Sequence, residues 1–191
     1  MLEHLPHGVG HALKDFRAGL ETTTYQQDDF AGAPETLTVS SEAFENGGPL
    51  PPRYTADGEK LSPPLAWTGV PDGAAALILI VEDADAPTPS SLVHTVAWAL
   101  PPERTSLDEG ALRSSGSGGE ALSLGLNSFF GAEYLPPDPL PGHGPHRYLF
   151  QLFALDAPPA LHGKPIRTQV IQAMKGHVMA KGCTIGIYER A

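Results

Sequence analysis

The sequence has little cysteine, few basic residues and no long apolar run. Its one cysteine, Cys183, has no partner within the chain for a disulfide, so nothing indicates an oxidising compartment. The 12 Lys and Arg residues are outnumbered by 22 Asp and Glu residues, which gives a formal net charge of -10, and they form no basic run. Because phosphate contacts need clustered positive charge, this balance argues against nucleic acid or an anionic membrane surface as a partner.

No apolar stretch approaches the roughly 20 residues of a membrane-spanning helix. The first thirty residues carry charges and no apolar signal-peptide block. We therefore expect a cytoplasmic protein without a membrane span.

Glycine and proline are abundant, and the length of 191 residues favours one domain. The 21 Gly and 20 Pro residues make up about a fifth of the chain, against roughly 12% on average. So many turn-forming residues exclude a helical bundle and predict short strands joined by long ordered loops.

The hydrophobic pattern predicts a mainly β domain. Continuous apolar runs are typical of strands buried on both faces. The strand candidates are Leu37–Ser40, Ala75–Val81, Leu92–Leu100, Tyr148–Leu155 and Cys183–Tyr188. A late helix is expected at Thr168–Lys181, because its apolar residues recur at helical spacing and Gly182 suits a left-handed helix end.

Residues 1–35 are expected to form an N-terminal arm in front of a domain that spans residues 36–191. Apolar residues of the arm recur at helical spacing, which predicts a helix there; they are Val9, Leu13, Phe16 and Leu20. Two interpretations stay open, since the arm either packs on its own domain or packs on a second subunit.

Candidate site residues gather at the ends of two strands. Asp83 and Asp85 directly follow the most apolar strand, and on an extended chain both carboxylates would point into one pocket. His146 and Tyr148 share one face of a later strand, while His94 lies in an apolar strand of its own. The long loop before His146 contains Gly131 and Pro136, which suit a rigid backbone rim; these two complete the list of candidates.

Other kinds of site find less support. Asp83, Asp85, His94 and His146 are possible zinc ligands, but no close pair of His or Cys residues fixes a metal site. No GxSxG elbow for a serine nucleophile occurs. Residues 116–121 match a dinucleotide-binding fingerprint, but they neither follow an apolar strand nor open a helix. We therefore expect no metal or cofactor.

Several motifs follow one another in a fixed order between about Leu37 and Arg190. They are Phe44 with Asn46-Gly47-Gly48 and Pro51, Arg53-Tyr54, Ser62-Pro63-Pro64-Leu65-Ala66-Trp67, Gly69-Val70-Pro71, Asp83 to Pro87, His94, Gly144-Pro145-His146-Arg147-Tyr148, and Gly176-His177 with Gly186-Ile187-Tyr188. In this order they resemble the phosphatidylethanolamine-binding protein (PEBP) family, also called the Raf-kinase-inhibitor-like proteins, and its bacterial branch in particular.

The resemblance implies a large antiparallel sheet packed on a smaller sheet, with a helix near the C-terminus. It also implies a small pocket for phosphate, phosphoethanolamine-like head groups or acetate-like carboxylates. By motif position, the lining would be Asp83, His94, His146 and Tyr148, with Pro136 on the rim and Asp85 supporting the loop. In such a pocket we expect Asp83 to accept an imidazole N–H, while the other ring nitrogen and the Tyr148 hydroxyl donate to the anion.

The function expected from the resemblance is a non-enzymatic binding or regulatory module, and the relatives suggest a homodimer. Two alternatives stay open. One is a hydrolase or lyase acting on a phosphorylated or carboxylated metabolite, with Asp83 and His146 as acid and base. The other is an inhibitor of a partner protease or kinase that acts through the loops between residues 111 and 145. The chain departs from the family at Thr95, where Trp is common, and in the lengthened loop at 131–142.

Overall fold

Strands dominate the computed structural model, which describes residues 7–113 and 122–190. The strands are β1 (Thr38–Ser40), β2 (Gly48–Pro49), β3 (Leu65–Thr68), β4 (Ala76–Asp83), β5 (Leu92–Leu100), β6 (Ser106–Leu107), β7 (Ser123–Leu124), β8 (His146–Leu155) and β9 (Val178–Tyr188). The α-helices are α1 (His7–Leu13), α2 (Asp28–Ala31) and α3 (Arg167–Met174), and single 3-10 turns are η2 (Leu20–Thr22), η3 (Thr24–Gln26) and η4 (Pro52–Tyr54).

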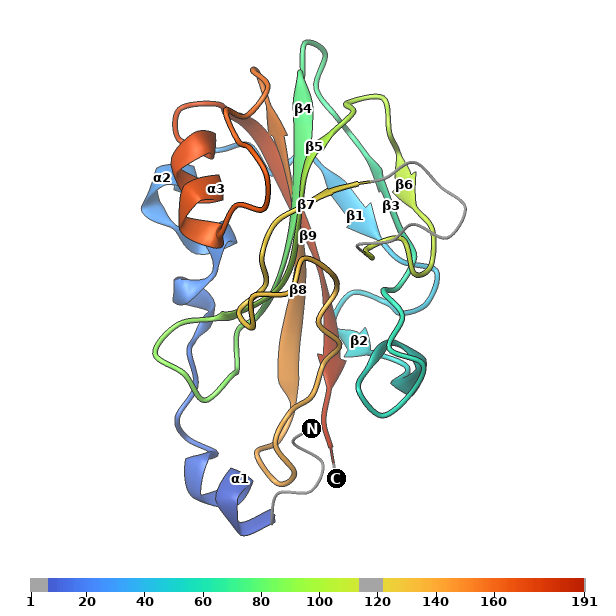
Figure 1. Cartoon of the computed structure of the whole chain (residues 1–191), viewed down its shortest axis with the longest axis vertical. Helices are drawn as coiled ribbons and strands as arrows, with labels where there is room; N and C mark the ends of the chain where they lie inside the picture. The colour runs from blue at the N-terminus through green and yellow to red at the C-terminus, as the bar shows by residue number, and fades with distance from the viewer. Residues whose placement is uncertain (1–6, 114–121, 191) are drawn as a thin grey trace.

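Two sheets form the layers of the described part of the chain (Figure 1). The large sheet has the strand order β2-β9-β8-β4-β5-β7, and the small sheet has the order β1-β3-β6. Neighbouring strands are antiparallel, except that the short β2 runs parallel to β9. The expected fold, a large sheet on a smaller one with a late helix, is confirmed.

The central strand β4 is buried along its whole length, as its unbroken apolar run predicts. Leu79 and Val81 point toward the small sheet, in a core cluster that includes Trp67. Ile78 and Ile80 point to the opposite face, where α3 and part of the N-terminal arm cover them. Figure 1 shows the same layering, with α2 and α3 on one side of the large sheet and β1, β3 and β6 on the other.

The second part of the arm, residues 18–35 (the inner arm), packs on this outer face of the large sheet. The rings of Tyr25 and Phe30 lie 6.2 and 5.7 Å from the ring of Phe153, measured between centroids. The backbone N–H of Tyr25 donates to the buried side chain of Gln151 at 2.7 Å. The inner arm therefore contributes to the core of its own domain, and a contact of the arm with a second subunit stays a prediction.

The helix expected at Thr168–Lys181 is shorter than its apolar spacing indicates. Gly176, with φ of +77°, turns the chain, and from Val178 onward the residues pair with β8. Gly182, the expected helix end, lies within β9, where a Cβ would meet the carbonyl oxygen of Leu37 at 2.1 Å. Strand pairing thus overrides the helical spacing in the second half of the segment.

The other elements agree with the sequence pattern apart from their ends. Strand β4 extends to Asp83 and β8 begins at His146, so both carry polar site residues in regular strand structure. Helix α1 is short, and Phe16 and Leu20 lie beyond it rather than on a continued helix. The fingerprint match at residues 116–121 lies outside the described residues.

Replacing Phe30 by alanine should lower the free energy of unfolding by about 3–5 kcal/mol, because the side chain is buried and its removal leaves a cavity beside Phe153. Phe129→Ala is the matched control, since Phe129 is 66% exposed and a change there should cost less than about 0.5 kcal/mol. Urea unfolding followed by tryptophan fluorescence measures both values. Small losses of equal size would contradict a core role for the inner arm.

Candidate functional site

Neighbouring ends of β4 and β8 bring a carboxylate and an imidazole together. Asp83 pairs with Tyr148 across the two strands, and His146 lies two residues before Tyr148 on the same face of β8. Oδ2 of Asp83 accepts a hydrogen bond from Nδ1 of His146 at 2.8 Å, and Oδ1 accepts the backbone N–H of Asp85, also at 2.8 Å. The expected pair of Asp83 with an imidazole is therefore present, and both carboxylate oxygens have donors.

A β-bulge in β5 brings His94 to the same place. The pairing of β5 with β4 skips one residue between Val93 and Thr95, and His94 is that extra residue. Its ring packs edge-on against Tyr148, with the ring centroids 5.2 Å apart. Its Nδ1 donates to the carbonyl of Leu135 at 2.6 Å, so the proton of the neutral ring resides on Nδ1.

Two buried polar atoms of this cluster have no hydrogen-bond partner among the described residues: Nε2 of His94 and the hydroxyl of Tyr148. Buried polar groups are nearly always paired, so such atoms mark a place of functional interest. Burial lowers the pKa of His94, and the carboxylate of Asp83 opposes this shift only in part. Burial, and then the charge of Asp83, raises the pKa of Tyr148 well above its ordinary value. At neutral pH the cluster thus offers a ligand one acceptor, the lone pair on Nε2 of His94, and one donor, the hydroxyl of Tyr148.

A third histidine, absent from the expected site residues, extends the cluster toward the N-terminal arm. Nδ1 of His143 lies 2.7 Å from Nε2 of His146. Nε2 of His143 lies 3.0 Å from the carbonyl oxygen of Leu13 and 3.3 Å from that of Phe16. Because a carbonyl can only accept, His143 carries its proton on Nε2, and its Nδ1 accepts from His146.

Three hydrogen bonds therefore run from Asp83 through His146 and His143 to the arm, and each bond needs one proton. An ionised aspartate and two neutral histidines supply only two protons. The complete chain of bonds holds one extra proton, which belongs to the coupled group. Burial, and then the charges of His146 and Arg17, lower the pKa of His143.

Asp85 does not share the site with Asp83, and the expectation that both carboxylates line one pocket is wrong. Strand β4 ends at Asp83, so alternation no longer applies and Asp85 lies in a turn. Its Oδ2 accepts the backbone N–H of Arg147 at 2.9 Å and the Nε of Arg147 at 2.7 Å. Burial opposes the ionisation of Asp85, but the bonds from Arg147 outweigh it and lower its pKa. The carboxylate supports the loop, as the resemblance implies.

Comparison with known proteins identifies the family of this chain. The family model described as PBP, phosphatidylethanolamine-binding protein, matches residues 40–189. The chain belongs to the PEBP family. A relative in this family, a UPF0098 protein of Methanothermobacter thermautotrophicus, is 38% identical over 154 residues, which cover 81% of this chain and 99% of the relative.

Solved PEBP structures show the same fold. A putative PEBP homologue from Chlamydia trachomatis superposes with a TM-score of 0.73 at 32% identity, and E. coli YbcL with a TM-score of 0.76 at 26% identity. Each alignment covers 82% of this chain and 99% of the other chain.

Of the two rim candidates in this PEBP protein, the structure brings one to the site. Pro136 directly follows Leu135, whose carbonyl accepts from the ring of His94 and whose N–H donates to the His94 carbonyl at 2.8 Å. Gly131 instead closes a turn, in which its N–H donates to the side chain of Asn127 at 3.0 Å. We conclude that Pro136 borders the cluster, whereas Gly131 shapes the loop.

The lengthened loop at 131–142 is held by a buried arginine from the C-terminal end of the chain. Nη1 of Arg190 donates to Asp138 at 2.7 Å and to the carbonyl of Pro139 at 2.9 Å. Nη2 of Arg190 binds Asp57 at 2.6 Å. One of the two acids that set this loop apart in the PEBP family therefore has a structural role.

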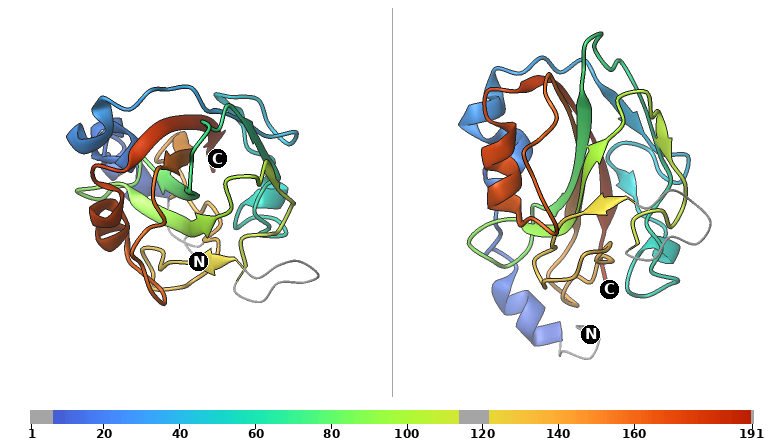
Figure 2. Two further views of the ribbon diagram at one scale, coloured as in Figure 1. Left: turned by 90° about the horizontal axis from the view of Figure 1, so that it is seen from above. Right: turned by 45° about the horizontal axis from the view of Figure 1, so that its top comes forward.

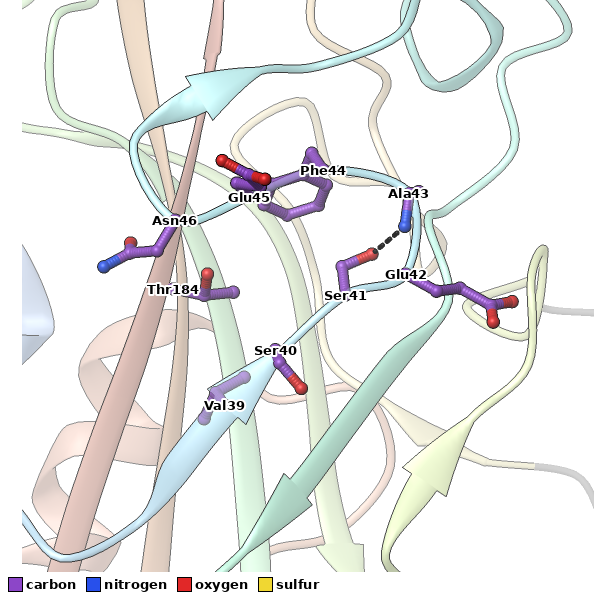
Figure 3. Close-up of a pocket in the computed structure, with 9 residues that line it drawn as sticks. All are labelled: Val39, Ser40, Ser41, Glu42, Ala43, Phe44, Glu45, Asn46 and Thr184. Carbon is purple, nitrogen blue, oxygen red and sulfur yellow. Dashed lines mark hydrogen bonds between the residues drawn. The ribbon is translucent and has the colours of Figure 1, made fainter.

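The described surface cavities of this PEBP protein lie away from the cluster. One of about 420 Å³ lies between residues 39–46 and Thr184 of β9 (Figure 3). Two others, of about 240 and 640 Å³, lie beside α3. None of the three is lined by an expected site residue.

The sequence analysis considers Asp85 as one of four possible zinc ligands. In the structure the carboxylate of Asp85 binds Arg147 instead. Within residues 7–113 and 122–190, no group of three or more His, Cys, Asp or Glu side chains is arranged to hold a metal ion. No helix among the described residues is long and apolar enough to cross a membrane.

Replacing His94 by glutamine should reduce the pH dependence of stability of this PEBP protein. Because the pKa of His94 is lowered in the folded state, the unfolded chain takes up this proton first, near pH 6.5. Wild-type stability therefore falls as the pH drops below 6.5, by at most about 1.4 kcal/mol per pH unit from this residue. Urea unfolding at pH 7.5 and pH 5.5 measures the free energy of unfolding of both proteins. The difference between wild type and variant should be smaller at pH 5.5 than at pH 7.5. An equal gap at both pH values would rule out this assignment.

Proposed function

We propose that this PEBP-family protein is a non-enzymatic binding or regulatory module for a small anion: phosphate, a phosphoethanolamine-like head group or a carboxylate. The observation that carries the proposal is the unpaired buried hydroxyl of Tyr148 beside the Asp83–His146 pair. A small anion at this place accepts from the hydroxyl, and its negative charge lies next to an imidazole held by a carboxylate.

Each side chain has a distinct part in this proposal. Asp83 fixes the orientation and the Nδ1 proton of His146, so that the Nε2–H of His146 donates to the anion. Tyr148 donates its hydroxyl, which the raised pKa keeps protonated. Charge-assisted hydrogen bonds contribute roughly 1.5–3 kcal/mol each. The two bonds together contribute about 3–6 kcal/mol. After the cost of immobilising the ligand this limits the affinity to about millimolar, where 1 mM corresponds to about -4.1 kcal/mol.

Binding is favoured over hydrolysis or lyase chemistry by the contacts of Asp83. A general base must lie within hydrogen-bond reach of the substrate proton that it takes. The two oxygens of Asp83 accept hydrogen bonds from His146 and from the backbone of Asp85. Such a carboxylate orients an imidazole and is poorly placed to take a proton from a substrate.

Inhibition of a partner enzyme, a homodimer and a cytoplasmic location remain proposals that rest on the sequence and on the resemblance.

Replacing His146 by alanine should abolish phosphate binding or weaken it at least about tenfold, since the donor paired with Asp83 is lost. Calorimetric titration of phosphate, phosphoethanolamine and acetate measures this. His177→Ala is the control, because His177 is an exposed histidine at the far end of β8 and pairs with Asp156. Equal affinities of His146→Ala and wild type would contradict the site. Phosphorus NMR should show phosphoethanolamine unchanged, and its turnover would favour the hydrolase alternative.

A further inference from the structure

The anion site is covered by the first part of the N-terminal arm, residues 7–17 (the outer arm). Nε2 of His146, the donor that the proposed function assigns to the anion, lies 2.7 Å from His143. His143 in turn binds the carbonyl oxygens of Leu13 and Phe16 in the outer arm. The donor is therefore used within the protein while the outer arm is docked.

Two features hold the outer arm against the loop that precedes β8. Arg17 donates to the carbonyls of His143 and Pro145, each at 2.7 Å, and its Nη1 lies 3.3 Å from Asp85. Helix α1 packs directly on the loop at Gly10, where a Cβ would lie 2.2 Å from the carbonyl oxygen of Pro141. No side chain fits there, so the close approach of helix and loop needs glycine at this position.

The outer arm adds little to the hydrophobic core, unlike the inner arm. Val9 and Phe16 are 40% and 50% exposed, whereas Phe30 is 1% exposed. Gly19, the second residue of the inner arm, has φ of +90° and donates its N–H to the carbonyl of Ala84 at 2.8 Å. Figures 1 and 2 show α1 beyond the end of the large sheet, apart from the other helices. A segment held mainly by polar contacts can undock without unfolding the domain.

We propose that the outer arm is an autoinhibitory cover of the anion site, and that His143 occupies the position in which the anion accepts the Nε2–H of His146. The inference rests on the proposed function. Anion binding then requires release of His143 and the outer arm. The observed affinity is the intrinsic affinity reduced by the fraction of molecules in which the site is open.

Gly10→Ala tests the cover without touching the site, and Gly8→Ala on the same helix is its matched control. A Cβ at Gly10 meets the loop backbone, whereas a Cβ at Gly8 meets nothing within 4 Å. Inorganic phosphate is titrated into each full-length variant by calorimetry, and release of the outer arm is followed by trypsin cleavage after Lys14. We expect Gly10→Ala to be cleaved faster and to bind phosphate at least about tenfold more tightly than wild type, and Gly8→Ala to match wild type.

His143→Ala separates a competitor from a ligand. If His143 occupies the place of the anion, its removal tightens phosphate binding; weaker binding would make His143 part of the anion site and overturn the cover. Faster cleavage of Gly10→Ala with an unchanged phosphate affinity would also overturn it, while binding that is lost in His146→Ala would still support the proposed function. Absence of binding of phosphate, phosphoethanolamine and acetate in every variant, including His143→Ala, would refute the proposed function itself. If Gly10→Ala leaves the rate of cleavage unchanged, the phosphate affinity of His143→Ala decides whether the cover exists: tighter binding supports it and weaker or unchanged binding overturns it.

Discussion

The hydrogen bond between the buried carboxylate of Asp83 and the ring of His146 is the interaction on which the rest of the site depends. A carboxylate that is only 4% exposed needs donors on both oxygens, and it finds them in this ring and in the backbone of Asp85. The ring, once oriented, presents its second nitrogen to His143 and, in the proposed function, to an anion. The register of β4 against β8 sets this geometry, and burial of both faces of β4 keeps the register in place.

Alternation along β8 gives the two neighbouring aspartates different tasks. His146 points inward to Asp83, and Arg147 points to the other face, where it binds Asp85. The Asp85–Arg147 pair fixes the turn after β4, and Asp85 also attracts Arg17 of the outer arm. One strand end thus connects the Asp83–His146 pair to the outer arm.

The sequence predicts the fold and the clustering of Asp83, His146, His94 and Tyr148, because apolar runs and ordered local motifs carry that information. His94 was expected from its motif, but the bulge that directs it to Tyr148 depends on pairing with β4 and leaves no local pattern. Asp85 was misplaced because alternation assumes a strand that continues past Asp83. The docking of the outer arm on His143 joins segments about 130 residues apart in sequence, and local periodicity contains no signal for such a contact.

Nitrogen NMR of the full-length protein with ¹⁵N-labelled histidine, recorded at pH 6 without added anion, tests the central claim most directly. The account predicts that both ring nitrogens of His146 carry protons and that His143 carries one only on Nε2. It also predicts a scalar coupling across the hydrogen bond between the two rings, which lie 2.7 Å apart at their nearest nitrogens. A neutral His146 in a single tautomer, without coupling to His143, would contradict it.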